Sequence, residues 1–230
     1  MRKIFSLCVL VVLISSFYGY GQTTNKAAEA ALTKGITMQQ KNNDFNTAII
    51  NYTKAIELDP KYVDAYNNRG DAYRNLKKYE EALADFTKAI ELDPKYVLAY
   101  NNRGFAYNAL KKYPEAIADY TKAIELDPKN AVAYYNRGIA YAGYEKYPEA
   151  IADYTKAIEL DPKYLFAYYG RGFAYDELKK YPEAIADYTK AIELDPRDAF
   201  AYNNRGIAYD ALGKTKEAEA DFAKAKAFQK

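Results

Sequence analysis

The sequence of 230 residues contains neither histidine nor tryptophan, and its one cysteine, Cys8, lies near the N-terminus. Its only serines, Ser6, Ser15 and Ser16, lie in the same stretch. Beyond residue 21 the chain therefore offers no Ser–His or Cys–His nucleophile pair, no disulfide and no zinc site built on His or Cys. We expect no enzyme here: no catalytic residue, no metal and no cofactor.

The charge of the chain is nearly balanced. Lys and Arg number 33 against 31 Asp and Glu, which gives a net charge of +2. This balance provides no electrostatic footprint for nucleic acid or for an anionic membrane surface. Since hydrophobic residues make up 50% of the chain, a disordered polypeptide is also excluded. We expect no nucleic-acid partner, and no membrane contact beyond an export signal.

The N-terminus has the layout of a secretory signal peptide. Arg2 and Lys3 precede an apolar run of 11 residues at 4–14, and small residues stand at Gly19 and Gly21. We predict a signal peptide over 1–21 that is cleaved after Gly21, a short linker over 22–26, and export to the periplasm or beyond. The alternative is an uncleaved membrane anchor, although a span needs about 20 apolar residues.

One heptapeptide, Lys-Ala-Ile-Glu-Leu-Asp-Pro, occurs five times at a constant spacing of 34 residues, first at 54–60. Such a period is the signature of a repeat protein. Division after each proline predicts six units: 27–60, which is degenerate and carries one inserted residue, 61–94, 95–128, 129–162, 163–196, and 197–230, which lacks the proline ending.

Each unit is predicted to form two helices. Apolar and small residues recur at helical spacing over 63–77 and again over 80–92, and no segment alternates with the period of a strand. Every first helix carries a central glycine such as Gly70, at a cost of about 1 kcal/mol relative to alanine. We therefore expect the partner helix to approach closely there, with small residues such as Ala82 facing the glycine.

This pattern resembles the tetratricopeptide repeat. In the second unit the resemblance rests on Tyr66, Gly70, Tyr73, Ala82, Phe86, Ala89 and Pro94. It extends over 27–230 and implies an all-α fold, a superhelical solenoid of six helix-turn-helix repeats whose first helices line the concave side. It also implies a protein that binds proteins or peptides.

A second stripe on each first helix is not needed for packing. In the second unit it is polar, with Asp64, Asn67, Asp71 and Arg74. From the third unit onward it carries apolar side chains, joined later by Asp176, Glu177 and Asp210. We predict a non-enzymatic scaffold whose groove binds a peptide or partner protein with apolar anchors and some positive charge. The predicted contacts are Leu98, Phe105, Tyr135, Ile139, Phe166, Tyr169, Phe173, Phe200 and Ile207.

Two alternatives apply to this stripe. The apolar side chains could instead fill the inside of a tight superhelix. Units 95–128 and 163–196 differ at six places, all on the first helix. That pattern is explained either by a constant frame with a varying groove or by drift after duplication.

Two polar series recur at the same spacing. The resemblance implies that asparagines in one series bond the backbone of an extended peptide; the alternative is a bond to a neighbouring helix. That series is Asn68, Asn102, Asn136 and Asn204, with Gly170 interrupting it. The other series, Arg69, Arg103, Arg137, Arg171 and Arg205, is expected to pair within the stack with acids such as Asp85 and Asp119, or else to bind an acidic partner.

A different function remains open at this point. The chain could be a self-assembling structural subunit or an accessory component of an envelope complex, so self-association is a possible partner choice.

Overall fold

The computed structural model describes residues 25–228 and is entirely α-helical over that range. The predicted signal peptide, 1–21, lies outside the described residues. The helices are α1 (Lys26–Asn42), α2 (Phe45–Leu58), α3 (Val63–Asn75), α4 (Tyr79–Leu92), α5 (Val97–Ala109), α6 (Tyr113–Leu126), α7 (Ala131–Gly143), α8 (Tyr147–Leu160), α9 (Leu165–Glu177), α10 (Tyr181–Leu194), α11 (Ala199–Ala211) and α12 (Thr215–Phe228).

Short turns set the spacing of the helices. Each second helix of the first five pairs ends at the leucine of the repeated heptapeptide, and the aspartate that follows caps it. In the first pair, the Asp59 carboxylate accepts a hydrogen bond from the Lys61 backbone N–H at 3.0 Å. Between α3 and α4, Lys77 adopts a left-handed conformation with φ 60°. The N–H of Lys78 then donates to the carbonyl of Tyr73 at 2.9 Å, which satisfies a carbonyl at the helix end.

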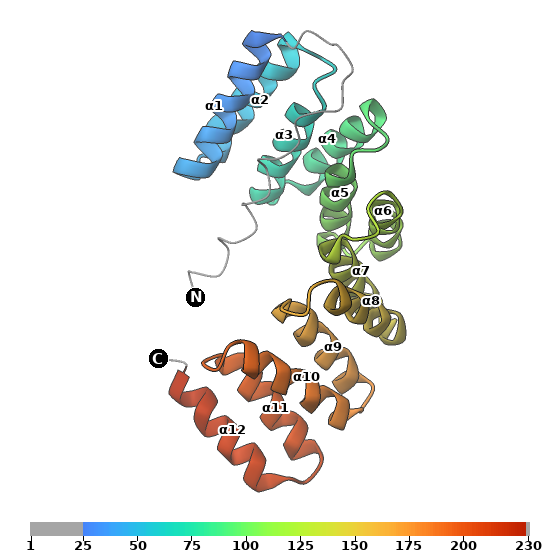
Figure 1. The fold of residues 1–230 in the computed structure, drawn as a ribbon. Coiled ribbons are helices and arrows are strands. Elements are labelled where there is room, and N and C mark those ends of the chain that lie inside the picture. Colours follow the sequence, from blue (N-terminus) through green and yellow to red (C-terminus); the bar gives the residue numbers. More distant parts are fainter. Residues whose placement is uncertain (1–24, 229–230) are drawn as a thin grey trace.

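The helices stack in chain order along a curved path. Each helix packs against the next, and successive first helices (α1, α3, α5, α7 and α9) also contact one another. Figure 1 shows α6 and α8 on the outer side of the bend, with α5 and α7 inside it. The predicted all-α superhelix of paired helices is therefore confirmed. The faces of the first helices α3, α5, α7, α9 and α11 that carry the second stripe are called the inner wall below.

The central glycines make room for an aromatic ring of the partner helix. A Cβ atom placed on Gly70 would lie 2.7 Å from the ring of Phe86, and one on Gly138 would lie 2.7 Å from the ring of Tyr154. Both rings belong to the second helix of the same repeat and are buried. Ala82, which was expected to face the glycine, is itself completely buried, and its contact with Gly70 stays a prediction.

The arginine series joins three helices at a time. Arg69 of α3 donates to both carboxylate oxygens of Asp85 on α4, at 2.8 and 2.7 Å, and to Thr53 of the preceding α2 at 3.0 Å. The Asp85 carboxylate raises the pKa of Arg69 through these bonds. The same arrangement recurs at Arg103, Arg137, Arg171 and Arg205. The predicted pairing within the stack is confirmed.

Candidate functional site

The inner wall exposes most of the apolar side chains that the sequence singled out. Two columns run along it, each holding one residue per first helix at the same helix position. Exposed side chains in these columns are Leu98, Phe105, Phe166, Phe173, Phe200 and Ile207, together with Val132, which was not among the predicted contacts. Tyr135, Ile139 and Tyr169 are half-buried, because each also packs against its neighbours. The structure therefore brings the nine predicted residues onto one wall, where six of them are freely accessible.

Aromatic rings connect three neighbouring repeats on this wall. Tyr135 of α7 lies 5.0 Å from Tyr164 and 6.5 Å from Phe166, measured between ring centroids. Tyr169 of α9 lies 6.4 Å from Phe166 and 5.2 Å from Phe200 of α11. Offset and edge contacts at such distances are favourable for aromatic pairs. The rings therefore form one continuous surface, in which Tyr164 was not predicted.

The acids of the later repeats are held by tyrosine hydroxyls. Tyr188 donates to Oδ2 of Asp176 at 2.7 Å, Tyr169 donates to Asp198, and Tyr147 donates to Glu177 at 3.3 Å. Burial raises the pKa of Asp176; the hydrogen bond from Tyr188 lowers it and the nearby Glu177 raises it. Oδ1 of Asp176 is buried and has no hydrogen-bond partner among the described residues.

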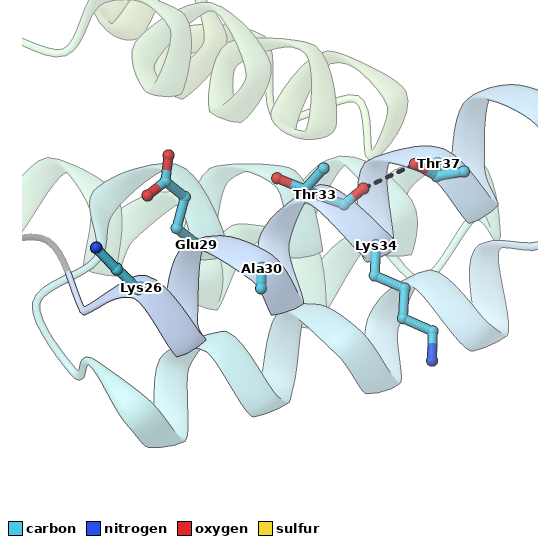
Figure 2. A pocket seen from close by; sticks show the side chains of 6 residues that line it. All are labelled: Lys26, Glu29, Ala30, Thr33, Lys34 and Thr37. Carbon is cyan, nitrogen blue, oxygen red and sulfur yellow. Dashed lines mark hydrogen bonds between the residues drawn. The ribbon is translucent and has the colours of Figure 1, made fainter.

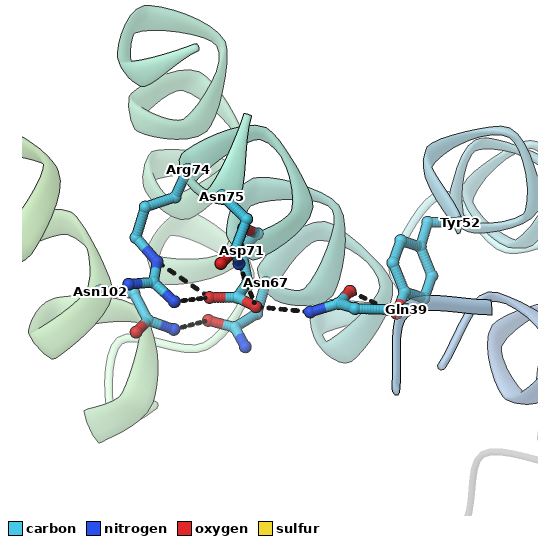
Figure 3. Close-up of polar contacts among 7 residues, drawn as sticks. All are labelled: Gln39, Tyr52, Asn67, Asp71, Arg74, Asn75 and Asn102. Carbon is cyan, nitrogen blue, oxygen red and sulfur yellow. Dashed lines mark hydrogen bonds and ion pairs between the residues drawn. The ribbon is translucent and has the colours of Figure 1, made fainter. Parts of the chain in front are cut away.

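The first half of the wall has a different character (Figure 3). Asp71 of α3 accepts hydrogen bonds from Gln39, Arg74 and Asn75. Arg74 also stacks over the ring of Phe105 on the next first helix, with its Cζ atom 4.8 Å from the ring centroid. The Asp71 carboxylate is thus neutralised by Arg74 within the chain, and the exposed Phe105 ring has the Arg74 guanidinium over it.

The asparagine series lies between the wall and the core. Asn68, Asn102, Asn136 and Asn204 are all half-buried. Asn102 donates to Oδ1 of Asn67 on the preceding first helix at 3.0 Å, so this member has a partner in a neighbouring helix. The use of the series for a peptide backbone stays a prediction.

Gly170 interrupts the asparagine series for a steric reason. A Cβ atom there would lie 2.5 Å from the Tyr154 ring, which also packs 5.8 Å from Tyr135. One repeat earlier, the position equivalent to Tyr135 holds Asn101, and the position equivalent to Gly170 holds Asn136. The glycine therefore accommodates the end of a ring that other repeats place against asparagine.

A separate hollow of about 500 Å³ lies on α1 (Figure 2). It is shallow, because its lining comes from successive turns of one helix: Lys26, Glu29, Ala30, Thr33, Lys34 and Thr37. Only one bond joins these residues, from the Thr37 hydroxyl to the Thr33 carbonyl at 2.9 Å. None of the predicted contacts lines this hollow.

No group of three or more acidic, histidine or cysteine side chains among residues 25–228 is placed to hold a metal ion. In the same part of the chain, no helix combines the length and apolar character needed to cross a bilayer.

The described chain is a solenoid of stacked helical hairpins, and in each repeat a glycine of the first helix contacts an aromatic ring of the second. The chain belongs to the tetratricopeptide repeat family, whose model matches residues 63–96, 97–130, 131–164 and 166–198. Two related models, a TPR repeat and a tetratricopeptide repeat, match residues 41–76 and 187–220.

Three individual proteins illustrate the likeness. MamA is 31% identical, with a TM-score of 0.66 over 70% of this chain and 94% of that one. YrrB, described as a TPR protein with an unusual peptide-binding site, is 28% identical, with a TM-score of 0.65 over 77% of this chain and 92% of that one. An uncharacterised protein, MJ0572 of Methanocaldococcus jannaschii, is 44% identical over 57 residues, which is 25% of this chain and 65% of that relative.

Proposed function

We propose that this chain is a non-enzymatic scaffold that binds a segment of a partner protein along the inner wall of its third to sixth repeats. The observation that carries the proposal is the row of exposed apolar side chains on consecutive first helices, including Phe166 and Phe200. A contiguous exposed apolar surface with polar groups beside it is the usual character of a binding site.

The division between constant and variable positions supports the same proposal. Residues 113–128, 147–162 and 181–196 have identical sequences, so the second helices of these repeats are held constant. The six differences between 95–128 and 163–196 lie on α5 and α9, and they include Leu98/Phe166 and Asn101/Tyr169 on the wall. The frame needs no such variation, whereas recognition of an asymmetric partner does.

The relatives support a protein or peptide ligand as well. YrrB has this fold and is described as having a peptide-binding site. We extend the proposal to the place of action: the leader at 1–21 directs export, so the partner is met in the periplasm or outside the cell. Intact-mass measurement of the exported chain tests this point, with cleavage after Gly21 as the expected result.

Partner capture from the native cell envelope, followed by mass spectrometry, tests the binding proposal. The variant Phe166→Asp/Phe200→Asp places two charges on the wall and is expected to lose the partners that the unmodified chain retains. The matched control, Ala152→Asp/Ala186→Asp, adds the same charge to exposed positions of α8 and α10 and is expected to keep them. Retention of every partner by the wall variant would refute the proposal.

A further inference from the structure

The carboxylate of Asp198, which precedes α11, has a different set of partners on each of its two oxygens. Oδ1 accepts hydrogen bonds from the backbone N–H groups of Phe200 at 2.8 Å and Ala201 at 3.2 Å, and so caps the N-terminus of α11. Oδ2 accepts a hydrogen bond from the hydroxyl of Tyr169 on α9. One side chain therefore joins the backbone of α11 to an aromatic ring on α9.

The ring held in this way lies between two exposed rings of the inner wall. The Tyr169 ring centroid is 6.4 Å from that of Phe166, with 62° between the planes, and 5.2 Å from that of Phe200, with 85° between the planes. Phe166 is 45% exposed and Phe200 is 58% exposed, whereas Tyr169 is half-buried. The position of the Tyr169 ring thus affects how both exposed rings are packed.

The Tyr169 hydroxyl acts as the donor of this hydrogen bond. Burial raises the pKa of Tyr169 above its ordinary value, and the bond to Asp198 raises it further. The hydroxyl therefore keeps its proton, which it shares with the carboxylate. Hydrogen bonds to an ionised acceptor are stronger than those between neutral groups.

No other junction between repeats has a carboxylate at this place. The residues at the equivalent positions are Tyr62, Tyr96, Asn130 and Tyr164. One repeat earlier, Tyr164 packs its ring 5.0 Å from the ring of Tyr135, which is the equivalent of Tyr169. A second ring thus supports the wall tyrosine in that junction, whereas a carboxylate supports it in the last one.

Capping of the helix alone does not require a carboxylate. Asn130 caps α7 by accepting a hydrogen bond from the Ala133 N–H at 3.0 Å, and the residue equivalent to Tyr169 is there Asn101. Asparagine has one acceptor oxygen, which is enough for a cap but provides no second acceptor. The second oxygen of Asp198 is therefore explained by Tyr169 and not by the helix.

We propose that Asp198 is a positioning residue of the binding surface, which orders the rings of Phe166, Tyr169 and Phe200 before a partner binds by holding the Tyr169 hydroxyl. Side chains that are already ordered lose less conformational entropy when a partner covers them. This inference rests on the proposed function, because Phe166 and Phe200 are the residues on which that function depends.

Two single variants remove the contact and keep both the cap and the ring. Tyr169→Phe deletes only the hydroxyl. Asp198→Ser retains a favourable capping residue, but its one oxygen is used by the cap and its side chain is shorter. Asn130→Ser is the matched control, because it exchanges one cap for another at a position where no wall tyrosine is held.

The first measurement is made on the chain by itself. Aromatic ¹³C NMR follows the Phe166 and Phe200 rings, whose signals are displaced by the ring current of Tyr169. We expect the displacement in the unmodified chain and in Asn130→Ser, and its loss through averaging in Tyr169→Phe and Asp198→Ser. Retention of the full displacement by both of these variants would overturn the proposal.

The second measurement is capture of partners from a dilution series of native envelope extract. Tyr169→Phe and Asp198→Ser are each expected to need about two- to tenfold more extract for the same capture, while Asn130→Ser behaves like the unmodified chain. The double variant Tyr169→Phe/Asp198→Ser is expected to be no weaker than either single variant, since both act through one hydrogen bond. Additive losses, or unchanged capture by the single variants, would refute the positioning role.

The positioning role and the proposed function fail in different ways. If capture depends on Phe166 and Phe200 but is unchanged in Tyr169→Phe and Asp198→Ser, the scaffold function stands and the role of Asp198 is wrong. If capture does not depend on Phe166 and Phe200, the proposed function is wrong, and Asp198 serves only the fold.

Discussion

Arg137 of α7 donates to both oxygens of Asp153, from Nε at 2.7 Å and from Nη2 at 2.8 Å, while its Nη1 donates to Thr121 at 3.0 Å. Thr121 belongs to the second helix of the preceding repeat, so a single side chain joins two repeats. The Asp153 side chain is only 8% exposed. A carboxylate this deeply buried needs its cation, because the energy of removing it from water is large.

Replacing Arg137 by methionine is therefore expected to destabilise the chain by about 3 kcal/mol, because Asp153 is left buried and unpaired. Urea unfolding followed by circular dichroism measures the loss. The double variant Arg137→Met/Asp153→Leu is expected to regain most of it, since the buried charge is then gone. Lys156→Met breaks only the exposed pair with Glu159 and is expected to cost less than about 0.5 kcal/mol. A similar cost for both single variants would contradict this account.

Gly138→Ala is expected to destabilise the fourth repeat by about 1–3 kcal/mol. Alanine has the higher helix propensity, by about 1 kcal/mol. The added methyl group, however, would lie 2.7 Å from the buried Tyr154 ring, and this ring has no room to retreat without shifting its helix. Thermal unfolding measures the change. A rise in the melting temperature would show that propensity outweighs the close contact.

Tyr188→Phe removes the hydroxyl that donates to Asp176 at 2.7 Å, while the chain itself has phenylalanine at the equivalent positions 86 and 222. We expect a stability cost of about 1–3 kcal/mol, because Asp176 loses the hydrogen bond to its Oδ2. Urea unfolding measures the change. An unchanged stability would mean that the hydroxyl contributes nothing to the fold.

The exposed face of α12 is where a second copy of the chain would have to stack if the repeats assembled end to end. Glu219 and Lys226 stand there at the positions where Leu83 and Ile90 of α4 face the next repeat. Charged groups on such a face oppose end-to-end stacking. We expect a sedimentation coefficient that does not change with protein concentration. The variant Glu219→Leu/Lys226→Ile exposes a stacking surface and should associate. Concentration-dependent sedimentation of the unmodified chain would favour the assembly alternative.

The sequence was sufficient to predict the helices, because the period of 34 residues and the prolines fix where they begin and end. The pairing of Arg69 with Asp85 could also be predicted, since both recur in register. The role of Gly170 could not, because it depends on how far the Tyr154 ring reaches toward the next repeat. Nor could the hydroxyl contact between Tyr188 and Asp176, because a helix position defines a face and not the partner of a side-chain oxygen.

A repeated frame that carries variable wall positions has a consequence for how a partner is recognised. Residues 97–109 of α5 and 165–177 of α9 occupy equivalent places and meet second helices of identical sequence. Exchanging the two segments would place Phe166, Tyr169 and Asp176 two repeats closer to the N-terminus, beside a second helix of the same sequence. The order of anchors along a bound polypeptide is therefore expected to follow the order of modules in this chain, so that a shuffled protein would select a correspondingly shuffled ligand.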